Sequence, residues 1–155
     1  MNPFHGLQLA IDLAERQRDA CAQALGHVLR QVQQGQQQMQ QLQSYAQDTD
    51  SRWTHGSSAA LSAELVRHHY QFMERLQHAI GMQDGVMANL ARQELQSRNA
   101  LAQAEMRVAG LKQVLKARMQ QRTASEQRRE QARMDEMAAL MHARNRVHPR
   151  MEDAR

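Results

Sequence analysis

The sequence predicts an all-α protein, an antiparallel two-helix coiled-coil hairpin with unequal arms in which the second helix overhangs the first. Apolar or small residues return at alternating steps of three and four along most of the chain. No proline interrupts the stretch from Leu61 to Val147. With one Trp, two Tyr and two Phe in 155 residues, the chain has few large side chains for a globular core. A helix pair needs only an apolar stripe.

The first helix is expected over residues 4–51. Its mean apolar step of about 3.5 residues is the heptad repeat of a coiled coil. The seam, meaning the residues expected to face the partner helix, is Phe4, Leu7, Ile11, Ala14, Arg18, Cys21, Leu25, Val28, Val32, Gly35, Met39, Leu42, Ala46 and Thr49. Only Arg18 departs plainly from the pattern. The glutamine-rich stretch 31–43 keeps the heptad, which favours an ordered coiled coil there. Gly35 marks either a weak point or a close helix approach.

A hairpin tip is expected over residues 52–60. The stretch from Ser51 to Ser58 contains Gly56 among Ser and Thr residues, which is typical of a loop followed by a helix cap. Ser58 and Ser62 are the candidate caps. A reversal near Gly56 predicts that partners across the hairpin have numbers summing to about 112. Phe4 would then lie opposite a residue near Val108, and everything later would overhang.

The second helix is expected over residues 61–147, followed by a frayed C-terminal tail, with 1–155 forming a single coiled-coil domain. Its seam is Met73, Leu76, Ile80, Gln83, Met87, Leu90, Glu94, Ser97, Leu101, Ala104, Val108, Leu111 and Leu115. After Leu115 the apolar residues thin out, because Gln-Arg-Glu runs separate the methionines at 119, 134, 137 and 141. Those runs are expected to be solvated unless a partner covers them.

One segment is more apolar than a two-helix seam requires. Phe72, Leu76 and Ala79 form a stripe turned beside the seam, and Gln38, Leu42 and Tyr45 lie at the same level of the first helix. These offset stripes predict either one exposed patch or a wider local core in which Phe72 packs on Tyr45. The residues alone leave both alternatives open.

The positive charge is concentrated in the last third of the chain. Residues 107–155 carry twelve Lys or Arg against six acids, whereas residues 1–50 carry three against five. A basic helix of this kind fits an acidic protein surface, a nucleic acid or an anionic membrane. We favour a protein partner and expect no nucleic acid, since the segment has no base-stacking aromatic residue. No apolar run is long enough for membrane insertion, so a cytosolic location is expected.

Enzymatic chemistry is not expected. The sequence has no phosphate-binding glycine loop or nucleophile elbow, and a helix pair has no enclosed cavity for a substrate. His68 and His69 are adjacent and point about 100° apart around a helix, and His55 and His78 do not complete a ligand set. We therefore predict no catalytic residues, no cofactor and no metal site.

The order and spacing of several segments resemble the flagellar export protein FliJ family. The resemblance covers nearly the whole chain. Its segments are Leu13 to Ala20, Ala24 to Gly26, the set Gln38, Leu42 and Tyr45, Tyr70 to Phe72 leading to Leu76, Ala79 with Ile80, Glu126 to Gln131, and Asp135 with Glu136.

The resemblance implies an antiparallel coiled coil that serves the flagellar type III export apparatus. Its implied partners are the hexameric export ATPase, the cytoplasmic domain of the membrane export gate, and export chaperones that are recycled. Its implied location is the cytoplasm, with peripheral association with the inner membrane through the apparatus. In the family, positions matching Phe72, Leu76 and Ala79 face outward and bind the gate. Gln38, Leu42 and Tyr45 match a second outward surface.

Two alternatives share the predicted coiled coil. One is the equivalent stalk protein of a virulence type III secretion system, which would differ in its substrates. The other is a basic coiled-coil protein that binds nucleic acid or acts as a self-associating scaffold, for which affinity for RNA or DNA would fall steeply with salt.

Overall fold

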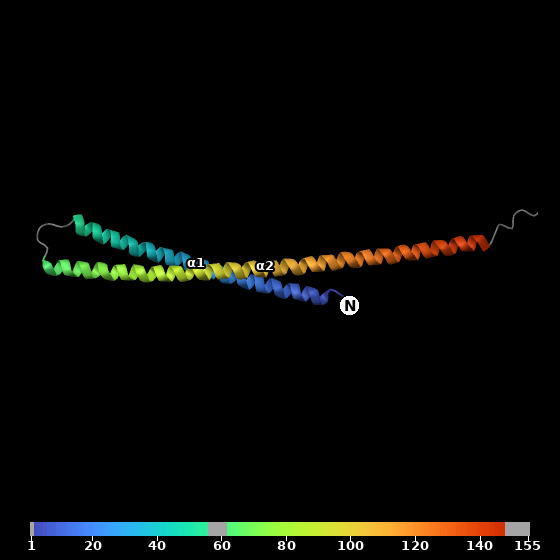
Figure 1. The fold of residues 1–155 in the computed structure, drawn as a ribbon, viewed down its shortest axis with the longest axis horizontal. Helices are drawn as coiled ribbons and strands as arrows, with labels where there is room; N and C mark the ends of the chain where they lie inside the picture. The colour runs from blue at the N-terminus through green and yellow to red at the C-terminus, as the bar shows by residue number, and fades with distance from the viewer. Residues whose placement is uncertain (1, 56–61, 148–155) are drawn as a thin grey trace, which may run out of the picture. The chain divides into compact units, whose positions relative to one another are not determined.

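The computed structural model describes residues 2–55 and 62–147, and these form two long helices (Figure 1). Helix α1 spans His5–His55, with 51 residues, and helix α2 spans Ala63–Val147, with 85 residues. The described residues contain no strand. The prediction of an all-α hairpin with unequal arms is therefore confirmed. Gly56, Ser58 and the expected C-terminal tail lie outside the described residues.

Polar side chains cap the starts of both helices. The Asn2 Oδ1 atom accepts a hydrogen bond of 3.0 Å from the backbone N–H of Phe4, just before α1. Pro3 follows this cap, where a missing N–H costs nothing. At the start of α2, the Ser62 Oγ atom accepts a bond of 3.2 Å from the Leu65 N–H. Ser62, one of the two predicted caps, is therefore confirmed in that role.

Helix α1 runs four residues further than the sequence predicted. Trp53, expected in the loop, is helical, and the Thr54 hydroxyl donates to the Asp50 carbonyl at 2.7 Å. The His55 Nδ1 atom lies 2.9 Å from the Ser51 carbonyl oxygen. The physical reason is that no glycine or proline lies between Gly35 and Gly56, so no helix-breaking residue stops the helix earlier in that stretch.

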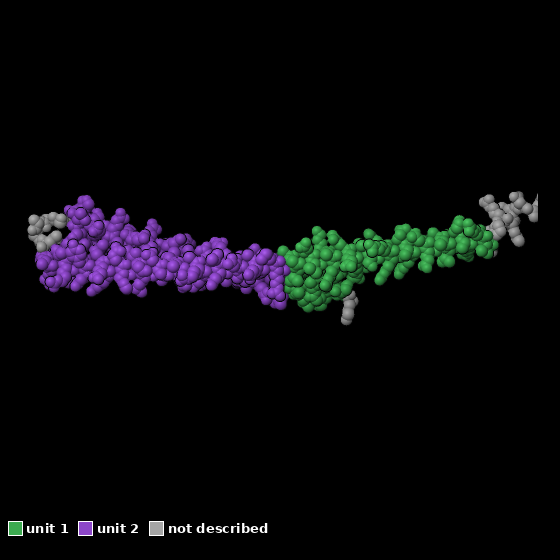
Figure 2. Space-filling view, in the orientation of Figure 1, with its two compact units in different colours: residues 1–11, 109–155 green, residues 12–108 purple. Residues whose placement is uncertain are grey.

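The contacts divide the chain into two compact units, each built from parts of both helices (Figure 2). Unit 2 comprises residues 12–108, and unit 1 comprises residues 1–11 with residues 109–155. The single coiled-coil domain over 1–155 stays a prediction.

Within unit 2 the helices pack in antiparallel directions. Trp53 stacks on His69, and Tyr45 touches Phe72. The buried hydrophobic residues of this unit are seam residues: Ala14, Leu25, Val28, Ala46, Leu76 and Val108. Every other predicted seam residue in the unit is buried or half-buried. The heptad pattern therefore identified the packed face of both helices.

The register across the helices differs from the prediction. Contacting pairs in unit 2 have numbers that sum to about 120, not about 112. In unit 1 the Phe4 ring lies under the Arg122 guanidinium, so the expected pairing of Phe4 with Val108 is wrong. The cause is the longer α1. Because α1 ends at His55 and α2 starts at Ala63, the numbers of residues paired across the two helices sum to more than 112.

The overhang of α2 consequently starts later than Val108. Leu111 and Leu115 are still half-buried, whereas every described residue of α2 from 125 to 147 is exposed. The exposed side chains include Met134, Met137 and Leu140, each more than three-fifths accessible. The overhang is therefore shorter than predicted and is exposed throughout its described length.

Candidate partner-binding surface

The candidate site is the offset surface, defined as Phe72, Leu76 and Ala79 of α2 with Gln38, Leu42 and Tyr45 of α1. On the α2 side, Phe72 is 38% exposed and Ala79 is half-buried. Leu76 is only 8% exposed, so the expectation that it faces outward is wrong. Leu76 follows the half-buried His69 by seven residues and Met73 by three, which places it on the seam.

On the α1 side, the three residues differ in their exposure. Tyr45 is 57% exposed and Gln38 is exposed, whereas Leu42 is a half-buried seam residue. Two of the three side chains are therefore accessible to a partner, and the third anchors α1 against α2.

The two aromatic residues of the offset surface come together. The rings of Tyr45 and Phe72 meet edge to face, with centroids 5.8 Å apart and planes at 73°. Aromatic rings favour this geometry because the positive ring edge meets the negative ring face. The pair is packed and yet accessible, so it combines the two alternatives that the sequence left open. The outer surface of the pair is aromatic and accessible to solvent.

Gln38 is held by a polar contact that crosses the helices. The Gln83 Nε2 atom donates to the Gly35 carbonyl at 3.0 Å and lies 3.4 Å from the Gln38 Oε1 atom. Gln83 is a half-buried seam residue, so its amide needs such partners. This contact fixes the orientation of an exposed side chain of the offset surface.

An aromatic cluster near the ends of α1 and α2 was missed by the sequence analysis. The Trp53 and His69 rings stack with centroids 4.0 Å apart and planes at 2°. Tyr70 meets His69 edge to face at 6.0 Å. The heptad spacing could have predicted this contact, because Trp53 follows the seam residue Thr49 by four residues and His69 precedes the seam residue Leu76 by seven. Assigning Trp53 to a loop concealed it.

The offset surface adjoins an open groove on α1. The groove beside Tyr45 is open, with a volume of about 520 Å³, and its lining is Gln37, Gln40, Gln41, Ser44, Tyr45 and Asp48. Among the described residues, no group of three or more His, Cys, Asp or Glu is placed to hold a metal ion. Within residues 2–55 and 62–147, neither helix is apolar enough over a sufficient length to cross a membrane.

Comparison with known proteins returns one family. A family model described as "Flagellar FliJ protein" matches residues 4–147, which include both helices and the whole offset surface. Neither the curated proteins nor the solved structures contain a match to this chain.

Proposed function

Because the chain belongs to the flagellar FliJ protein family, a family of flagellar export components, we propose that it couples the export ATPase to the membrane export gate. The family match over residues 4–147 is the observation that carries this proposal. In our proposal the chain is a non-enzymatic coiled coil that binds the ATPase hexamer and the cytoplasmic domain of the gate. It also helps to recycle export chaperones. It works in the cytoplasm and reaches the inner membrane only through the apparatus.

We assign gate binding to Phe72, Leu76 and Ala79. The accessible Phe72 ring supplies the direct contact, since partly exposed aromatic side chains are favoured at the centres of protein interfaces. Leu76 lies in the seam one helical turn after Phe72 and is buried, so in this proposal it positions the helix face, and the small Ala79 leaves room for a partner to approach. Gln38, Leu42 and Tyr45 form the adjoining partner-binding surface, and the Tyr45–Phe72 contact makes the two surfaces continuous.

Coupling requires an element that does not bend easily. Helix α2 is continuous over its 85 residues, and no proline interrupts it. A paired helix transmits a displacement or an orientation that a flexible linker would lose. The proposed mechanism is therefore mechanical, and it assigns no catalytic residue, metal or cofactor to the chain.

Deletion of the gene in its own bacterium tests the proposal. Loss of the coupling protein should abolish or strongly reduce swimming, and the wild-type copy should restore it. A tagged copy should co-purify the export ATPase from the restored strain. Normal swimming of the deletion strain, together with no ATPase in the purified fraction, would contradict the proposal. Normal flagella and normal swimming of the deletion strain, together with a loss of virulence protein secretion, would favour the virulence homologue.

A further inference from the structure

Unit 1 contains an open groove where α1 begins beside α2. The groove has a volume of about 660 Å³. We call it the arginine groove, and its lining residues are Pro3, Phe4, Arg118, Gln121, Arg122, Ser125, Glu126 and Arg129. It shares no residue with the offset surface, which lies in unit 2.

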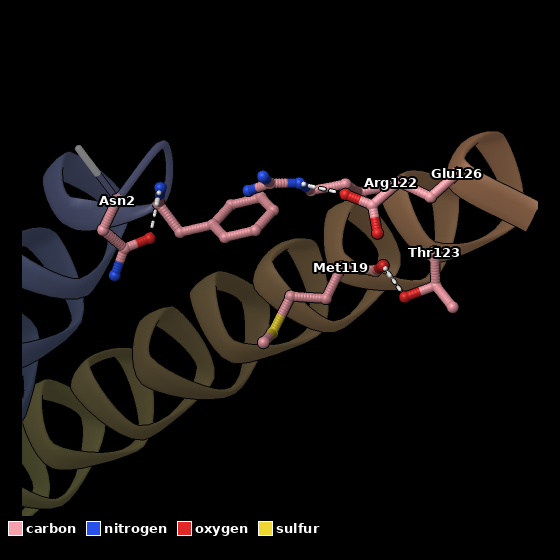
Figure 3. A network of polar contacts seen from close by, with 6 residues as sticks. Asn2, Met119, Arg122, Thr123 and Glu126 are labelled. Atoms are coloured by element: carbon pink, nitrogen blue, oxygen red, sulfur yellow. Dashed lines mark hydrogen bonds and ion pairs between the residues drawn. The ribbon is translucent and has the colours of Figure 1, made fainter. Parts of the chain in front are cut away.

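The arginine groove has fixed positive charge to offer a ligand. The Arg122 guanidinium lies 5.7 Å from the centroid of the Phe4 ring, and its Nε atom donates to Glu126 at 3.1 Å (Figure 3). These two contacts hold Arg122 in place. Glu126 is the one carboxylate among the lining residues, and it pairs with Arg122. Among the described residues, Arg118 and Arg129 form no ion pair, so the positive charges of these two arginines are not neutralised within the groove.

The arginines continue the seam of α2. Arg122 and Arg129 follow the seam residue Leu115 at intervals of seven residues. Arg118 follows the seam residue Leu111 by seven residues. Leu111 and Leu115 are half-buried, whereas all three arginines are exposed. Along the seam face of α2, leucines are therefore replaced by arginines near the level at which α1 begins. A helix laid in line with α1 would meet this face with the same spacing.

We propose that the arginine groove docks an acidic amphipathic helix of a partner protein, laid along α2 as a continuation of α1. Carboxylates at heptad spacing would pair with Arg118 and Arg129 in the two-pronged geometry that guanidinium groups favour. An apolar residue of the same helix would reach the Phe4 and Pro3 end. The contact goes beyond gate coupling, because it names a second interface and the chemistry of its partner.

Two other occupants fit less well. A second copy of the chain would bring the same arginines against this face, and like charges would repel. A single-stranded nucleic acid would need an open aromatic face for stacking, whereas Arg122 covers the Phe4 ring.

A binding assay with the full chain tests the inference. The probe is a labelled helical peptide of about three heptads, with Glu at the seam-facing positions and Leu beside them. Its affinity is measured by fluorescence anisotropy at low and moderate salt. The matched pair of variants is Arg129→Glu and Arg128→Glu. Both residues are exposed and give the same charge change, but only Arg129 lines the groove.

The inference predicts that Arg129→Glu and Arg118→Glu each weaken peptide binding about tenfold, while Arg128→Glu changes it by less than about threefold. Circular dichroism should show unchanged helicity in every variant. Equal losses for Arg128→Glu and Arg129→Glu would overturn the inference, because they would mean attraction to net charge alone. Absence of peptide binding, or equal binding of a peptide with Lys in place of Glu, would also overturn the inference. So would a dimer, detected by sedimentation, whose formation excludes the peptide. Displacement of the peptide by a short single-stranded RNA whose binding also needs Arg129 would assign the groove to nucleic acid instead.

Discussion

At the scale of single residues, Gly35 shows why one position of the seam is glycine. A Cβ atom built there would lie 2.6 Å from the Met87 sulfur and 3.4 Å from a methyl carbon of Leu90. The absent side chain lets Met87 fill the space against the α1 backbone, and the Gly35 carbonyl accepts the bond from Gln83. Of the two meanings that the sequence offered for Gly35, the close helix approach is confirmed.

The surroundings of two glycines in unit 2 predict different outcomes when each is replaced by alanine. Gly85→Ala should raise the free energy of unfolding by about 0.5–1 kcal/mol, because nothing lies within 4 Å of the added Cβ and alanine favours the helix. Gly35→Ala should give no such gain, since the new methyl group displaces Met87. Thermal or urea unfolding followed by circular dichroism measures both values.

The control for the Gly35 prediction is a double-mutant cycle with Met87→Ala. Removing the methionine should make Gly35→Ala more favourable by about 1 kcal/mol than it is in the wild-type background. The effect of Gly85→Ala should be the same in both backgrounds. A gain of equal size for both glycines in the wild-type chain would show that Met87 does not occupy the space beside Gly35.

At the scale of helices, the sequence predicted which face of each helix packs but not how the faces are aligned. Heptad spacing is a local property, so the predicted seam agrees with the burial of both helices. Register depends on where the two helices end and begin, and the Gly56 signal predicted pair sums of about 112 where the contacting pairs sum to about 120. A repeating seam does not reveal such an error, because shifted pairings also match small residues with apolar ones.

Sequence reasoning offered the Tyr45–Phe72 contact as one of two alternatives, and it placed Leu76 both in the seam, where the structure has it, and in the offset stripe. The reason is that residues 72, 76 and 79 read as one stripe, while residue 76 also belongs to the stripe of 73 and 80. Only packing decides between two overlapping stripes. The arginine groove escaped notice because arginines at heptad positions look like the end of a seam rather than its continuation.

The exposed part of α2 makes a prediction about local stability. Backbone amides in residues 130–147 should exchange hydrogen for deuterium at least about tenfold faster than those in residues 87–108. The reason is that residues 130–147 are exposed, and most of the stability of a helix in a protein comes from the packing of one face, which this segment lacks. Exchange read out by mass spectrometry measures both segments in one experiment. Equal protection that persists on dilution would contradict an uncovered helix end.

At the scale of the whole molecule, the chain presents two different surfaces in its two units. The offset surface in unit 2 is aromatic, and the arginine groove in unit 1 is basic. Because they have different chemistry and share no residue, they suit two different partners. The proposed coupling role requires two such separate surfaces, and the division allows each proposed contact to be removed without the other.

The central claim is that Phe72, Leu76 and Ala79 of the offset surface bind the export gate, and Phe72→Ala tests it most directly. Tyr70→Ala is the matched control, because Tyr70 is an aromatic residue of the same helix, is 67% exposed and lies outside the offset surface. The measurement is the affinity of the purified chain for the cytoplasmic domain of the gate, by calorimetry, with helicity checked by circular dichroism. The account predicts that Phe72→Ala weakens binding at least about tenfold at unchanged helicity, while Tyr70→Ala leaves binding within about twofold. Equal affinity of the wild-type chain and Phe72→Ala would contradict it.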